Sequence, residues 1–194
     1  MKKQFDRRIY NIATFKTAIA DAMAHIGEFK AARRSGRVSK AFSERIMLAV
    51  TQVNGCRYCH YGHAKAALAA GVSQEDIQYL VAGEFDELPK EEVIALLFAQ
   101  HYAESEENPA PEAWQRVVDA YGPDAARDIM AAIRMITVGN LWGNTFDALL
   151  SRLASNPAPG SSLWQELGVL AGSFYIIPAA LIKRRLYRHG KTVV

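Results

Sequence analysis

The sequence predicts an all-α protein, built as a bundle of several helices. Apolar residues recur at intervals of three and four through most of its 194 residues, which is the periodicity of one helix face. Short stretches rich in glycine, proline and serine separate these periodic segments. No stretch has the strict apolar–polar alternation of a half-buried strand, and no internal repeat is present.

The first periodic segment predicts an amphipathic helix over residues 5–30, with Gly27 as its stop. Its apolar face consists of Phe5, Ile9, Ile12, Phe15, Ile19, Met23 and Ile26. The segment that follows, residues 31–40, is basic and has the composition of a turn. Its cations are Arg33, Arg34, Arg37 and Lys40. Two interpretations stay open for them: a solvated loop, or an anion-binding rim beside a functional site.

The middle of the chain predicts three further helices in close succession. Ser43 is a good N-cap for a helix over residues 44–53, which is apolar nearly all round and is therefore expected to be buried. An alanine-rich helix follows as far as about residue 70, where Gly71 caps it. Ser73 then opens a short helix, with Asp76 in the position of a capping box.

The second half predicts longer helices. Pro89 fits the first turn of a helix that carries His101 on an apolar face, where a satisfied core histidine is the favoured interpretation and a role near the thiols is the alternative. Gly122 and the proline after it separate a helix over residues 112–121 from a long one. In that long helix, Gly139 and Gly143 are four residues apart, as are Asn140 and Asn144. Small residues at this spacing favour close packing of another helix, and the alternative is a pocket lined by Trp142 or by either asparagine.

We expect a helical domain over residues 1–155, and a linker with a C-terminal apolar helix over residues 156–194. The linker, residues 156–162, contains two prolines and three serines or glycines. The uncharged run over residues 167–182 is shorter than the ~20 residues of a membrane span, and Pro178 interrupts it. A helix packed on the same domain or on a neighbouring subunit is therefore preferred to a membrane anchor.

The charge balance excludes several partners. There are 23 basic and 20 acidic residues, a net charge of +3, which is too balanced to indicate nucleic acid. The polar N-terminal residues do not predict a signal peptide, so we expect a cytoplasmic protein. In that reducing compartment a C-x-x-C pair is more often catalytic or metal-binding than structural.

That pair, Cys56 and Cys59, is the most informative feature of the chain. It follows Gly55 and precedes strong helix formers, so the thiols are predicted in the first turn of a helix. Unpaired N–H groups and the helix dipole favour a thiolate there. His63 lies one turn after Cys59, near enough to exchange a proton with its thiol, and the two sulfurs can form a disulfide. Glu44, on the preceding apolar segment, is the candidate acid.

Together, Glu44, Cys56, Cys59 and His63 resemble the E-x11-C-x-x-C-x-x-x-H core motif of alkylhydroperoxidase D, in the carboxymuconolactone decarboxylase superfamily. The resemblance covers residues 42–80. It implies an all-α bundle in which Cys59 attacks a peroxide, Cys56 resolves the product, and His63 and Glu44 relay protons. The chain departs from the family at Tyr58, where the best known members carry a second histidine. Decarboxylases of the superfamily lack the cysteine pair, so that activity is not expected.

The function that follows is a thiol-dependent peroxidase or disulfide oxidoreductase without a bound cofactor. Its implied partners are a hydroperoxide, a dithiol electron donor of protein or lipoyl type, and further copies of the chain in a trimer or hexamer, without nucleic acid or membrane. By the dipole argument Cys56 has the greater thiolate character, whereas the resemblance and the neighbouring base favour Cys59 as the nucleophile. Accessory roles are considered for Tyr58, His60 and His101.

Two other functions remain open. The two cysteines and His63, with Glu44 or water, would give the ligands of a zinc site, although a structural site usually has a second C-x-x-C or an H-x-x-x-H partner. The chain would otherwise be a non-enzymatic helical interaction protein with incidental cysteines. Such buried thiols would titrate with a pKa near or above the reference value of ~8.5.

Overall fold

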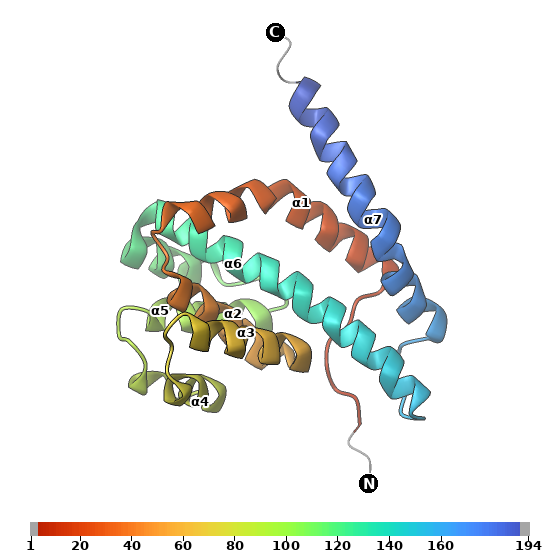
Figure 1. Cartoon of the computed structure of the whole chain (residues 1–194), viewed down its shortest axis with the longest axis horizontal. Coiled ribbons are helices and arrows are strands. Elements are labelled where there is room, and N and C mark those ends of the chain that lie inside the picture. Colours follow the sequence, from red (N-terminus) through yellow and green to blue (C-terminus); the bar gives the residue numbers. More distant parts are fainter. Residues whose placement is uncertain (1–3, 191–194) are drawn as a thin grey trace. The chain divides into compact units, whose positions relative to one another are not determined.

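Every regular element is a helix in residues 4–190, the part that the computed structural model describes, with side chains described as far as residue 182. The predicted all-α fold class is thus confirmed. Figure 1 shows the helices in the order α1 (Ile12–Ser35), α2 (Lys40–Asn54), α3 (Arg57–Ala69), α4 (Gln74–Ala82), the 3-10 turn η1 (Phe85–Glu87), α5 (Val93–Glu104), α6 (Pro111–Leu153) and α7 (Leu163–Gly190).

The chain divides into two compact units. Residues 28–140 form the first, which we call the cysteine unit. The second, which we call the terminal unit, consists of the described parts of residues 1–27 and 141–194. Helices α1 and α6 each contribute to both units, because the division falls within them.

Helix α2 is the centre of the cysteine unit and packs against α3, α4 and α5 (Figure 1). Nine of its 15 residues are buried, among them the whole run from Arg45 to Thr51, as its apolar composition predicts. The core around it also takes side chains from α6. Its fully buried members include Ile46, Leu48, Val50, Leu80, Leu96, Val117, Ile129 and Ile133.

A buried arginine fixes α2 to its neighbours. Arg45 donates to Asp76 at 2.7 Å and to Glu92 at 3.0 Å, which ties α2 to the first turn of α4 and to the residue before α5. Burial raises the pKa of Glu92, and the nearby guanidinium opposes this rise. Since Glu44 is the neighbour of Arg45, these ion pairs also fix the position of the candidate acid.

The first two helix starts were predicted one or two turns out of place. Residues 5–11 are not helical; α1 begins at Ile12, after Asn11, whose side chain accepts from the N–H of Thr14 at 2.8 Å. Gly27 does not stop α1, which continues to Ser35 with Arg33 and Arg34 in its last turn. Cations at a helix C-terminus interact favourably with the dipole, and Gly36 at φ +70° then ends the helix.

The cap of α2 is Ser39, whose hydroxyl accepts from the N–H of Phe42, and the expected cap Ser43 lies inside the helix. Pro89 was also misplaced, because α5 begins only at Val93, with Glu92 as its N-cap, and Pro89 lies in the turn before it. Two other signals agree with the sequence. Ser73 accepts from the N–H of Asp76 at the start of α4, and Gly122 breaks α6 with φ +76°.

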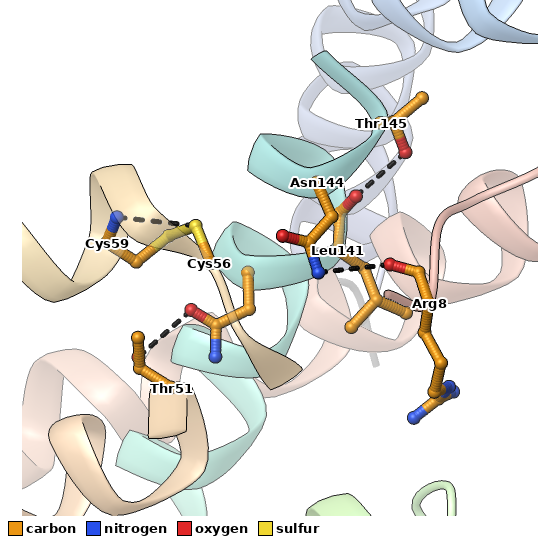
Figure 2. The surroundings of a disulfide bond; sticks show 8 residues. Arg8, Thr51, Cys56, Cys59, Leu141, Asn144 and Thr145 are labelled. Carbon is orange, nitrogen blue, oxygen red and sulfur yellow. Dashed lines mark hydrogen bonds between the residues drawn. A yellow bond between two sulfur atoms is a disulfide. The ribbon is translucent and has the colours of Figure 1, made fainter. Parts of the chain in front are cut away.

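The terminal unit has its own small core around Phe5, Ala148 and Ala158. The amide of Asn144 donates to the backbone carbonyl of Arg8 at 3.0 Å, a bond drawn in Figure 2. Arg7 pairs with Asp147. In α7, Glu166 is fully buried and accepts two hydrogen bonds from Arg152, at 2.8 and 2.9 Å, and one from Ser161.

Within the described residues, α7 is the one helix that by length and composition alone is apolar enough to span a membrane, over Leu163–Ile182. Only 11% of that window is buried. The basic run that follows Ile182 in the sequence lies outside the described side chains.

Candidate active site

The cysteine pair sits on a tight turn between α2 and α3. Gly55 caps α2 in the left-handed conformation, at φ +69°, which a residue without Cβ adopts without strain. Cys56 is then the N-cap of α3, and its sulfur accepts from the N–H of Cys59 at 3.3 Å, as a serine hydroxyl would at this position (Figure 2). The predicted placement of both thiols at the start of a helix is confirmed.

The two sulfurs are joined in a disulfide, across a Cα–Cα distance of 5.3 Å (Figure 2). Their surroundings differ. Cys56 is 1% exposed, whereas Cys59 is half-buried and contributes to the wall of a cavity. A small molecule in that cavity therefore meets Cys59, and Cys56 lies behind it.

A carboxylate and an imidazole share this cavity with Cys59. Nδ1 of His63 lies 2.7 Å from Oε2 of Glu44, so α2 and α3 are joined by this bond beside the cysteines. With Nδ1 protonated and donating to the carboxylate, Nε2 keeps its lone pair and is free to exchange a proton. The structure thus brings together three of the four motif residues around one cavity, and the fourth is bonded to Cys59.

The cavity has a volume of about 490 Å³, within the range of small-molecule sites. One face of α2, with residues one turn apart, runs along it through Lys40, Ser43, Glu44 and Met47. The other walls come from the end of α1, the turn after it, α3 and α6. Their lining residues are Phe29, Ala32, Arg33, Gly36, Val38, Ser39, Cys59, His63, Asp128, Ala132, Met135, Ile136 and Gly139.

The sequence did not identify the α6 wall of this cavity. Gly139 was expected to serve helix packing, but a Cβ built on it would meet nothing within 4 Å, and the residue faces the cavity. Asn140, the next residue, is fully buried and accepts from the hydroxyl of Thr51 at 3.0 Å. The signal that points to the wall is the stripe of Asp128, Ala132, Met135, Ile136 and Gly139 at helical spacing.

The three accessory candidates lie elsewhere. Tyr58 is exposed, accepts a hydrogen bond from Arg57 and carries that guanidinium over its ring, while His60 is not among the cavity-lining residues. His101 accepts from the N–H of Ala110 at 3.0 Å and lines a separate cavity of about 410 Å³. It is hydrogen-bonded, as the favoured interpretation held, but it is half-buried at this cavity and is not a core residue.

Among the described residues, no group of three or more His, Cys, Asp and Glu side chains is arranged to hold a metal ion.

Comparison with known proteins gives one match. Residues 18–100 match the sequence model of the carboxymuconolactone decarboxylase family. The matched segment contains Glu44, both cysteines and His63, and it ends before the α6 wall of the cavity. No curated protein and no solved structure matches the chain.

Proposed function

Because residues 18–100 belong to the carboxymuconolactone decarboxylase family and carry a cysteine pair, we propose that this protein is a thiol-dependent peroxidase that reduces hydroperoxides. The observation that carries the proposal is the 2.7 Å contact between Glu44 and His63 in the cavity that Cys59 also lines. A nucleophile, a base and the group that orients the base are thereby available to one bound molecule.

Access supports Cys59 as the attacking residue. It faces the cavity, and His63, one turn further along α3, faces the same cavity. Cys56 is 1% exposed and therefore suited to resolve the product rather than to meet the substrate.

The proposed cycle starts from the reduced pair. The Cys59 thiolate attacks the terminal oxygen of ROOH, the O–O bond breaks, and the alkoxide takes a proton to leave as ROH. Cys59 is then a sulfenic acid. The Cys56 thiol attacks its sulfur, which forms the disulfide and releases water. The peroxide has taken two electrons from the two thiols.

The Glu44–His63 pair handles the protons of the attack on the peroxide. Neutral His63 accepts the proton of the Cys59 thiol, and the imidazolium that results is stabilised by the Glu44 carboxylate. The same imidazolium then returns the proton to the departing alkoxide. A dithiol donor, of protein or lipoyl type, restores the thiols by exchange, and we place the protein in the cytoplasm as a homo-oligomer.

The test is peroxide consumption with a dithiol reductant, run on the wild type and on Cys59→Ser and Cys56→Ser. Cys59→Ser is expected to lose turnover. Cys56→Ser is expected to stop with a sulfenic acid on Cys59, which dimedone traps and mass spectrometry locates. The serine at position 56 keeps the helix cap, since its hydroxyl also accepts from the N–H of residue 59. An unmodified Cys59 in Cys56→Ser, or normal turnover in Cys59→Ser, would overturn the assignment.

A further inference from the structure

The cavity beside Cys59 carries positive charge that the thiol chemistry does not use. Arg33, in the last turn of α1, and Lys40, the first residue of α2, both line it. Neither makes an ion pair within the described part of the chain, and the Arg33 guanidinium lies over the ring of Phe29, 5.9 Å from its centroid. Both side chains are exposed at the cavity rim.

The acids that line the same cavity do not neutralise them. Asp128 is 6% exposed and is already engaged by Arg37, whose guanidinium donates to both carboxylate oxygens at 2.8 and 3.0 Å. The hydroxyl of Ser35 donates to it as well. The other acid of the cavity, Glu44, is bonded to His63. Arg33 and Lys40 are therefore the charges that remain available to a bound molecule.

Most of the remaining wall is apolar. Phe29, Met47, Met135 and Ile136 offer aromatic, thioether and aliphatic surface, and Gly139 leaves open space where a side chain would otherwise project. Lys40 lies one turn, roughly 6 Å along the helix axis, before Glu44. Arg33, Lys40 and Cys59 line the same cavity, so one molecule with an apolar chain can carry an anionic group to the rim and a reacting group to Cys59.

We propose that the cavity selects amphipathic carboxylates, so that the preferred substrate is a hydroperoxide on an apolar chain that ends in a carboxylate. Arg33 and Lys40 bind the carboxylate at the rim, the chain lies along the α6 wall, and the hydroperoxide reaches Cys59. The hydroperoxide part of this statement rests on the proposed function, whereas selection of the carboxylate does not. Gly139 sets the size of chain that the wall accepts.

Binding tests the charge selection without any turnover. We would titrate the protein in its disulfide form with decanoate and with decanol, which differ in the charged group, by calorimetry at low ionic strength. The wild type is expected to bind decanoate more tightly. Arg33→Gln or Lys40→Gln should lower the affinity ratio of decanoate to decanol by about threefold, and the double variant by about tenfold.

Arg34→Gln is the matched control, because it removes the same charge one residue away from Arg33 and is not a cavity-lining residue. Its affinity ratio should stay within twofold of the wild type. The proposal is overturned if the wild type does not prefer decanoate, if the double variant keeps the wild-type ratio, or if Arg34→Gln lowers the ratio equally.

Turnover separates this proposal from the proposed function. We expect kcat/KM to be higher for 12-hydroperoxydodecanoate than for its methyl ester, and the double variant to reduce this ratio. If no peroxide is consumed while decanoate selection persists, the peroxidase assignment fails and the anion site stands. If both peroxides are consumed equally well, the anion site fails and the peroxidase assignment stands.

Gly139→Leu tests the apolar wall. It should lower the ratio of kcat/KM for dodecyl over tert-butyl hydroperoxide, and Gly139→Ala, which is the smaller change and favours the helix, should lower it less. An unchanged ratio in both variants would remove the α6 wall from the substrate site.

Discussion

The Glu44 carboxylate is a polar group on a helix whose other side chains are mostly buried, and it is itself only 13% exposed. A partly buried carboxylate is costly unless it is paired, and His63 is its partner here. The contact therefore has a structural role as well as the proposed catalytic one. A variant that removes the charge but keeps the shape distinguishes these roles.

We predict that Glu44→Gln slows oxidation of the reduced pair by about 100-fold while the protein stays folded. The amide oxygen still accepts from Nδ1 of His63, but it no longer stabilises the imidazolium. Stopped-flow measurement of disulfide formation with excess peroxide gives the rate, and circular dichroism gives the melting temperature. An unchanged rate in a folded variant would exclude Glu44 from the proton relay.

At this scale the sequence was most informative where chemistry follows from local spacing. Cys59 and His63 lie one turn apart in α3 and Cys56 is its N-cap, so local spacing alone brings these three residues together. The pairing of Glu44 with His63 joins two helices, and no local spacing determines it; the family resemblance supplied that expectation. For Arg33 and Lys40, the sequence left two interpretations open, a solvated loop or an anion-binding rim. It could not decide between them, because charge patterns do not reveal which cations lack partners.

At the scale of the helices, the glycine between α2 and α3 determines where the thiols point. Gly55 at φ +69° lets α2 end and α3 begin within two residues, which makes Cys56 the cap and turns Cys59 toward the cavity. A side chain at this φ is strained, so the turn depends on glycine.

We predict that Gly55→Ala destabilises the protein by about 1 kcal/mol and lowers peroxide turnover by about tenfold. Chemical denaturation and steady-state kinetics give the two quantities. Gly83→Ala has the same kind of strain, at φ +79° in the cap of α4, and should lose stability without the loss of turnover. Gly62→Ala, inside α3, should be neutral or stabilising. Equal turnover in Gly55→Ala and Gly83→Ala would contradict this account of the turn.

The helix boundaries show which local signals decide and which do not. Ser73 and Gly122 act as predicted because no equivalent signal lies nearby. The predictions at Gly27 and Ser43 were wrong because a second glycine, Gly36, lies nine residues after the first, and a second serine, Ser39, lies four residues before Ser43. The choice between such pairs depends on tertiary packing, which buries α1 side chains on both sides of Gly27, and single-sequence signals do not contain that information.

At the scale of the whole molecule, α7 carries exposed apolar surface that a membrane or another subunit would cover. It exposes Trp164, Phe174 and Tyr175, each at least 77% exposed, which is unusual for large apolar side chains of a soluble monomer. Glu166 lies within the window that is long enough for a membrane, but it is fully buried and bonded to Arg152. The uncharged remainder, residues 167–182, covers roughly 24 Å, less than the ~30 Å of a bilayer core.

This shortfall favours other copies of the chain as the partner of α7, in agreement with the homo-oligomer expected from the resemblance. We predict that light scattering after gel filtration gives a trimer or hexamer without detergent. A monodisperse monomer, or solubility only in detergent, would contradict it.

Acid stability tests the packing of α7 within the terminal unit. Burial by itself would raise the pKa of Glu166, but the hydrogen bonds from Arg152 and Ser161 and the charge of Arg152 outweigh it and lower the pKa below its ordinary value. A carboxyl group with a lowered pKa in the folded state contributes stability that is fully present above the unfolded value of about 4.3. That stability is lost as the pH falls through the folded pKa.

We therefore predict that the wild-type Tm falls steeply as the pH is lowered below about 4.3, and that Glu166→Gln flattens this fall. At pH 7 the same variant should melt about 5 °C lower, because Arg152 loses a charged acceptor while the shape is kept. Calorimetry from pH 3 to pH 7 measures both effects, with the exposed Glu104→Gln as a control that should follow the wild type. If Glu166→Gln and the wild type lost stability in parallel down to pH 3, the ion pair would not be what holds the first turn of α7 in place. The contacts that hold this turn would then be those of Gln165, whose amide donates to the carbonyl of Tyr10 at 3.4 Å, and of Val169, which is fully buried.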